Sequence, residues 1–220
     1  MARTVANGSS RLLRANVPQF VRVGSDMTTS RATAADAARV LATADMVLTA
    51  GQVDEAYSRM ATAIQLTLGG TSPLVLACMV GGLIPAAGLL GRMQMELEIG
   101  YVHATRYRGG TSGHDVEWRV PPPPGLEGRH VLVVDDILDE GYTLAAIVDA
   151  VREAGAASVR SAVLVEKRHG RKAPALEADF TGLECPDRYV FGCGMDYKGW
   201  HRQLPAIYAV ADGDRARSRP

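Results

Sequence analysis

Cysteine is scarce in this chain of 220 residues, and its formal net charge is zero. The cysteines Cys78, Cys185 and Cys193 form neither a C-x-x-C pair nor the spacing of a zinc site, a pattern typical of reduced thiols in a cytosol. We therefore expect a cytoplasmic protein. The 24 acidic residues balance the 24 basic ones, so the charge gives no support for a nucleic-acid or membrane-surface partner.

Long apolar runs are also missing. None approaches the roughly 20 residues that a membrane-spanning helix needs. Residues 1–26 lack the uninterrupted apolar core of a signal peptide. We expect them to be a disordered leader, with Met27 as another possible functional start, while their basic, acid-poor composition also fits an organelle presequence. Residues 27–211 are expected to form one domain, followed by a flexible tail over 212–220.

Helix and strand patterns alternate along the chain. Alanine-rich residues 32–45 predict a helix, and apolar residues spaced by three or four up to Leu68 predict a second. The continuous apolar run 73–80 predicts a buried strand. The remaining expected elements are a helix over 83–90, strands over 97–103, 130–134 and 158–165, a helix over 143–154, and short strands around 189–191 and 206–210. This order predicts an α/β fold, with a mainly parallel twisted sheet flanked by helices on both faces.

The stretch 130–144 carries the strongest chemical signal. After an apolar strand it places a pair of acids, a third acid, a glycine and a threonine: Asp135, Asp136, Asp139, Gly141 and Thr143. The backbone N–H groups of residues 139–143, at the start of a helix, can surround a phosphate. The acids beside them suit a sugar with free hydroxyls and a bound divalent cation. Two acids alone are equally typical of a solvated strand end, but the added glycine and threonine favour a phosphate site.

This stretch resembles the phosphoribosyl-diphosphate (PRPP) motif of type I phosphoribosyltransferases, in which an acidic pair and D-x-G-x-T follow an apolar strand. Its details are similar to the hypoxanthine-guanine branch in a bacterial variant, and the likeness runs from about Asp45 to Val210. The resemblance implies the type I phosphoribosyltransferase fold, with a small hood over the active site formed by about 176–205 and an N-terminal segment. It makes Asp139 the catalytic residue, a general base near N7 of a purine. The residues that it implies bind PRPP and nucleotide are Asp135, Asp136, Ile137, Leu138, Glu140, Gly141, Tyr142 and Thr143.

A second glycine segment follows the strand at 73–80. By themselves, Gly81 and Gly82 usually mark only a turn. In the resemblance, Val80, Gly81 and Gly82 form the pyrophosphate loop, with a strained non-proline peptide whose amides face the leaving diphosphate. Arg202, which in isolation would be a surface charge, matches the arginine that binds the pyrophosphate.

The base pocket is implied by three further residues. Lys167 would alone be a solvated lysine at a strand end, but it matches the lysine that donates to the 6-oxo group of the purine. A cation there favours hypoxanthine, guanine or xanthine over adenine, whose 6-amino group is itself a donor. Tyr189 alone would be a core residue; it matches the aromatic that stacks on the base, and Val190 supplies backbone groups to the base edge.

A magnesium ion is the cofactor that the resemblance implies. Asp196 matches the carboxylate that reaches a second magnesium, commonly through water, and Asp135 and Asp136 help to position the metal. Hard oxygen ligands and retained waters are what Mg²⁺ prefers. Neither zinc nor a redox cofactor is expected.

The polar, glycine-rich loop 105–118 is the expected lid, with Arg106 and Tyr107 in it. Its closure would exclude water from the reaction centre and prevent hydrolysis of PRPP. At four positions the chain departs from the residues commoner in the family: Val80, Arg106, Glu140 and Tyr142. We expect Glu140 to point outward while the backbone amides bind the phosphate.

The function implied is purine salvage: transfer of 5-phosphoribosyl from PRPP to hypoxanthine or guanine, giving IMP or GMP and pyrophosphate, in a homodimer or homotetramer. A xanthine-preferring enzyme remains open as an alternative. A nucleotide-sensing regulator that keeps the fold and binds RNA is another, although the zero net charge and the set Asp139, Lys167 and Asp196 count against it. A dinucleotide enzyme is excluded because no G-x-G-x-x-G follows a first strand.

Overall fold

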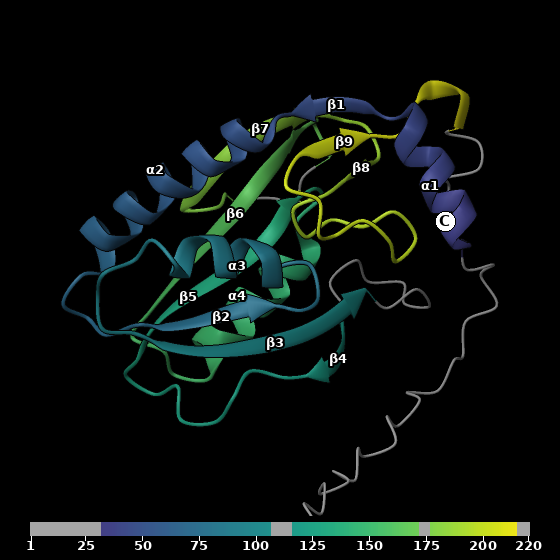
Figure 1. The fold of residues 1–220 in the computed structure, drawn as a ribbon. Helices are drawn as coiled ribbons and strands as arrows, with labels where there is room; N and C mark the ends of the chain where they lie inside the picture. The colour runs from purple at the N-terminus through teal and green to yellow at the C-terminus, as the bar shows by residue number, and fades with distance from the viewer. Residues whose placement is uncertain (1–31, 107–115, 172–176, 215–220) are drawn as a thin grey trace, which may run out of the picture. The chain divides into compact units, whose positions relative to one another are not determined.

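A six-stranded sheet is the larger layer of the computed structural model, which describes residues 32–106, 116–171 and 177–214 (Figure 1). In spatial order its strands are β4 (Val116–Val120), β3 (Glu98–Arg106), β2 (Leu74–Cys78), β5 (His130–Leu138), β6 (Ser158–Arg168) and β7 (Phe180–Pro186). Neighbouring strands are parallel, except that β4 runs antiparallel to β3. The predicted α/β fold class is therefore confirmed.

Helices cover both faces of this sheet (Figure 1). The helices α2 (Ala50–Leu68) and α3 (Leu83–Leu90) pack on one face, and α4 (Tyr142–Glu153) packs on the other. Alternation along a strand divides its side chains between the two cores. In β2, Val75 and Ala77 join the core under α2 and α3, whereas Leu74 and Leu76 join the core under α4. Burial on both faces explains why β2 and the first half of β5 are continuous apolar runs.

A smaller antiparallel sheet contains β1 (Asp45–Leu48), β9 (Ile207–Ala209) and β8 (Val190–Phe191), in that order. Its core includes Phe191 and Val210 together with Val40 of the helix α1 (Ala34–Thr43). The short strands expected near 189–191 and 206–210 are present, but they belong to this layer and not to the parallel sheet. The strand β7, which falls within the range expected for the hood, is hydrogen-bonded to β6 in the main sheet.

Several boundaries differ from the predicted ones. The first helix ends at Thr43, and after Ala44 the residues Asp45–Leu48 form β1, which is too short to show a sequence period and is held by pairing with β9. The ends of the expected loop 105–118 are strands: Thr105 pairs with Glu117, and Arg106 pairs with Val116. Tyr107 lies outside the described residues, as does the expected leader 1–26. Of the expected tail, residues 212–214 form a 3₁₀ turn. Within the ranges that the structure describes, no helix is long and apolar enough to cross a membrane.

Candidate active site

The strand β5 continues beyond the point where its neighbour β2 ends. Its predicted range was 130–134, because two carboxylates indicate the end of a buried strand, but it extends through Asp135 and Asp136 to Leu138. Pairing with β2 stops at Val134, whereas pairing with β6 continues to Leu138. The acid pair therefore lies beyond the end of β2, where the edge of β5 that faced β2 is open to the loop that follows β2.

Glycines let the loop after β2 approach this acid pair. A Cβ on Gly81 would lie 2.1 Å from Oδ2 of Asp136, and a Cβ on Gly82 would lie 2.5 Å from a carbonyl oxygen of β5. A Cβ on Gly194 would lie 2.3 Å from the carbonyl oxygen of Gly81. Real side chains do not fit at these separations, so this crossing requires glycine. The peptide bond before Val80 is cis, and the Val80 side chain is half-exposed.

The two acids of the pair lie in an environment that disfavours their charges. Burial, together with repulsion by Asp136, raises the pKa of Asp135 well above its usual range. Burial raises the pKa of Asp136 to about 6, although Arg202 acts in the opposite direction. The nearer guanidinium nitrogen of Arg202, Nη1, is still 3.9 Å from Oδ2 of Asp136. The negative charge of the pair is therefore only partly compensated within the protein.

Arg202 connects this pair to the loop around Asp196. Its Nη2 lies 2.5 Å from Oδ1 of Asp196, and its Nη1 donates to the carbonyl oxygen of Gly194 at 2.6 Å. The other oxygen of Asp196 accepts from the backbone N–H of Gly199 at 2.5 Å. The structure thus brings Asp136, Arg202 and Asp196 together. The carboxylates of Asp136 and Asp196 are hard oxygen donors, and the charge of Asp136 is only partly compensated, so these two side chains fit a divalent cation such as Mg²⁺.

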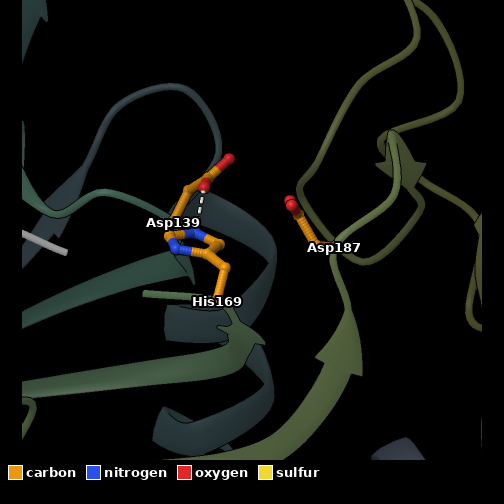
Figure 2. A group of neighbouring side chains, drawn as sticks. All are labelled: Asp139, His169 and Asp187. Atoms are coloured by element: carbon orange, nitrogen blue, oxygen red, sulfur yellow. Dashed lines mark hydrogen bonds and ion pairs between the residues drawn. The ribbon is translucent and has the colours of Figure 1, made fainter. Parts of the chain in front are cut away.

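Asp139, just beyond the end of β5, lies between a lysine and a histidine instead. Lys167 donates from Nζ to Oδ2 of Asp139 at 2.6 Å. Nε2 of His169 lies 2.7 Å from Oδ1 of the same carboxylate (Figure 2). The Asp139 side chain is 42% exposed, whereas that of His169 is 3% exposed. Burial acts to raise the pKa of Asp139, but the hydrogen bonds and charges of Lys167 and His169 outweigh it and hold the pKa below its usual value. This carboxylate therefore stays ionised where the acid pair resists ionisation.

Asp187, after β7, faces Asp139 and His169 across the same space (Figure 2). One ligand atom from each of the three lies within 4.8 Å of the others, which is close enough for a metal site. However, Lys167 already binds Asp139, and Arg171 forms a two-fold ion pair with Asp187 at 2.8 and 2.9 Å. Because protein cations already bind both carboxylates, the arrangement favours an internal hydrogen-bonded network.

The turn between β5 and α4 has the backbone that a phosphate site needs. Gly141 stands at the N-cap of α4 with a left-handed φ of 87°, and it makes no side-chain capping bond. The helix begins at Tyr142, one residue before its predicted start. Glu140, Tyr142 and Thr143 are half-buried at this helix N-terminus. Anions are stabilised at such ends by the N–H groups and the helix dipole, so the geometry suits a phosphate, while each residue's contact to one stays a prediction.

The residues expected around a base lie in two layers. Lys167 is near the carboxyl end of β6, where it pairs with Cys185 of β7. Tyr189 packs edge-on against Tyr197 at 5.9 Å between ring centroids, and Val190 is buried in β8. These contacts of Tyr189 are those of a partly buried core residue, and its stacking on a base stays a prediction. Arg106 is placed only by the strand pairing of its backbone.

His169 is a member of the site that the sequence interpretation missed. No role is assigned to it from the sequence. The available signal was its position two residues after Lys167, because alternation in an extended strand directs such residues to the same side. Asp187 was also missed, and its place is set only by the pairing of β7 with β6.

Comparison with known proteins agrees with this geometry. The family model of the phosphoribosyl transferase domain matches residues 43–198. A hypoxanthine-guanine phosphoribosyltransferase of Streptococcus pneumoniae is 32% identical over 157 residues, which are 71% of this chain and 87% of that protein. One from Bacillus subtilis is 36% identical over 138 residues, 62% of this chain and 76% of that protein. A crystal structure of a hypoxanthine phosphoribosyltransferase from Staphylococcus aureus has a TM-score of 0.73 at 25% identity, covering 80% of this chain and 94% of that one. This chain therefore belongs to the phosphoribosyl transferase domain family and is a transferase.

Proposed function

We propose that this protein is a magnesium-dependent purine-salvage enzyme, which transfers 5-phosphoribosyl from PRPP to hypoxanthine or guanine and releases IMP or GMP with pyrophosphate. The observation that carries the proposal is the contrast at the end of β5. An under-compensated acid pair lies against the glycine loop, and Asp139 is held by Lys167 a few residues further on. The names of the related proteins support the choice of base.

The sugar and its diphosphate would bind at the acid pair. Asp135 and Asp136 hold the ribose hydroxyls and, with Asp196, a Mg²⁺ ion. When bound, this ion stabilises negative charge on the departing pyrophosphate. The backbone of Gly81 and Gly82 and the guanidinium of Arg202 bind the same group. The amides of residues 139–143 hold the 5-phosphate at the start of α4.

The purine would bind beside Asp139. Lys167, whose ammonium now donates to Oδ2 of Asp139, turns to donate to the 6-oxo group of the base. The freed carboxylate oxygen then faces N7 and takes up its proton as a general base. Tyr189 stacks on the base and Val190 contacts its edge. Adenine would place its 6-amino group, a donor, against the donor groups of Lys167, so the 6-oxopurines are favoured.

The lid and the assembly are further parts of the proposal. Closure of the loop 105–118, which includes Arg106 and Tyr107, excludes water from the reaction centre. We place the reaction in the cytoplasm, with small molecules as ligands and with a homodimer or homotetramer as the working assembly.

The experiment is an assay of pyrophosphate release with PRPP and Mg²⁺ against hypoxanthine, guanine, xanthine and adenine in turn. Release with hypoxanthine and guanine, and not with adenine, is the expected result. Faster release with xanthine than with the other bases would instead support the xanthine-preferring enzyme. No release with any base, together with nucleotide binding, would support the nucleotide-sensing regulator and overturn the proposal.

A further inference from the structure

His169 has both of its ring nitrogens engaged although its ring is almost completely buried. Nδ1 accepts a hydrogen bond from the backbone N–H of Arg171 at 3.1 Å, and Nε2 lies 2.7 Å from Oδ1 of Asp139. A backbone N–H can only donate, so Nδ1 carries no proton in this arrangement. The neutral ring that fits these partners is therefore the Nε2–H tautomer, which donates to Asp139.

This hydrogen bond gives each oxygen of Asp139 its own donor. Lys167 holds Oδ2 from inside β6, and His169 holds Oδ1 from just beyond the end of the same strand. If Lys167 turns to the 6-oxo group of a base, one donor leaves and the carboxylate gains freedom to rotate. His169 remains, because its ring is buried and its other nitrogen is tied to the backbone of Arg171.

We propose that His169 is a positioning residue for Asp139: it fixes Oδ1 and so aims Oδ2 at the purine. This inference deepens the proposed function and rests on it. With no free ring nitrogen, His169 does not itself take the proton of the base. A neutral ring is sufficient for this role, because the donor is the Nε2–H group. A catalytic acid or base must be held in the correct orientation, and loss of the group that orients it misplaces the reacting atom.

Other charged groups face this pair from the neighbouring strands and turns. The titratable groups next to Asp139 and His169 are Lys167 from β6, Cys185 from β7, Arg171 and Asp187 from the segments that follow these strands, and Glu140 from the turn before α4. Arg171 and Asp187 pair with each other. Lys167 and His169 are the groups whose hydrogen bonds favour the ionised form of Asp139. Removing the His169 donor should therefore shift the ionisation of Asp139 to higher pH.

The test compares three variants in steady-state kinetics with hypoxanthine. His169→Leu removes the donor while filling part of the ring volume, and His169→Gln keeps an amide N–H to donate and a carbonyl to accept. His130→Leu is the matched control, because His130 also makes a side-chain hydrogen bond, between its Nδ1 and Oγ of Ser158 at 2.8 Å, but at the opposite end of β5.

We expect His169→Leu to lower kcat roughly tenfold with little change in KM for PRPP, because a misplaced reacting group costs rate more than binding. The acid limb of kcat/KM should move to higher pH in this variant and return toward the wild-type position in His169→Gln. His130→Leu should change thermal stability alone. A wild-type kcat and acid limb in His169→Leu would overturn the inference, as would equal impairment of the Leu and Gln variants.

A second measurement separates this inference from the proposed function. Nitrogen-15 NMR of the wild-type protein reports the tautomer of His169 whether or not any base is a substrate. We expect the proton on Nε2; a proton on Nδ1 would overturn the inference. An inactive wild-type protein would instead overturn the proposed function, and His169→Leu would still be expected to raise the titration midpoint of the Asp139 carboxyl in carbon-13 NMR.

Discussion

Asp136 and Asp139 lie close together at the end of one strand, but their surroundings differ in kind. Asp136 is buried against the glycine loop, the guanidinium of Arg202 is 3.9 Å from its Oδ2, and its pKa is raised to about 6. Asp139 is half-exposed between Lys167 and His169, and its pKa is lowered. The first acid is kept short of positive charge, as a group that receives a cation must be. The second has its own cation and donor, which keep its carboxylate ionised at neutral pH.

The two surroundings have opposite effects on folding. Ionising Asp136 costs free energy in the folded state, so its charge lowers the stability of the protein. Ionised Asp139 is favoured in the folded state, so its charge contributes to stability. Substitutions that remove one charge at a time therefore test whether the two acids differ in this way.

The largest effect is expected from removing the carboxylate that handles the proton. Asp139→Asn should lower turnover with hypoxanthine by at least tenfold, since general-base catalysis is typically worth ~10²–10⁴ in rate. PRPP affinity should be retained, because the acid pair and the glycine loop are untouched. Steady-state kinetics and PRPP titration measure the two quantities. Asp149→Asn, which removes a mostly exposed aspartate of α4, is the control for loss of one charge. Unchanged turnover in Asp139→Asn would show that Asp139 is not the base.

The next effect concerns the acid pair alone. Gly81→Ala would place a methyl group 2.1 Å from Oδ2 of Asp136 and displace that carboxylate or the loop. Forcing extra atoms into a packed site costs about 1–3 kcal/mol, so we expect PRPP binding in the presence of Mg²⁺ to weaken roughly tenfold or more. The partners of Asp139 are Lys167 and His169, so the titration of Asp139 in carbon-13 NMR should be unchanged. Gly51→Ala in α2 is the control, where the nearest side-chain atom is 3.9 Å away and alanine should stabilise the helix slightly. Wild-type PRPP affinity in Gly81→Ala would contradict the close approach.

A smaller effect with an unusual sign is expected at Asp136. Its pKa in the folded state, about 6, lies above the ordinary value of 3.8, so the folded protein binds more protons between these values and gains stability as the pH falls through that window. The cost of the ionised form is fully present above about pH 6. Asp136→Asn should therefore stabilise the ligand-free protein by about 1–2 kcal/mol at pH 7.5, and the gain should fade toward pH 4. Urea unfolding at the two pH values measures it, and a destabilised variant at pH 7.5 would contradict the assignment.

The smallest effect is the stability change in Asp139→Asn, which should have the opposite sign. The folded-state pKa is lowered, so the carboxylate contributes stability above its ordinary pKa that is lost as the pH falls through the folded-state value. The group is 42% exposed, so solvent screening limits the loss to less than about 1 kcal/mol at pH 7.5. Parallel unfolding of the Asp136 and Asp139 variants compares the two signs directly. Changes of the same sign in both variants would remove the distinction between the two acids.

The parts of the site that follow one another in the chain were accessible from the sequence. The acid pair, Asp139 and the glycine of the turn all lie within the seven residues 135–141, so their order alone predicts a strand, a turn and a helix start. The glycines after β2 were predictable for the same reason. By contrast, the position of His169 depends on the pairing of β6 with β5, and β1 depends on β9 far along the chain. Such long-range pairing leaves little local pattern, and in β1 and β8 the strands are too short to show a period.

The close contact of Gly81, Asp136 and Gly194 has a consequence for how the protein acquires its activity. These residues come from three distant parts of the chain, and they meet at separations that leave no room for a methyl group. Closing such long loops costs conformational entropy, and this cost is offset only when the sheets and their crossing loops have formed together. A partly folded chain can thus contain every helix and still lack the site. Recovery of turnover after refolding is accordingly a measure of long-range assembly, whereas recovery of helical signal is not.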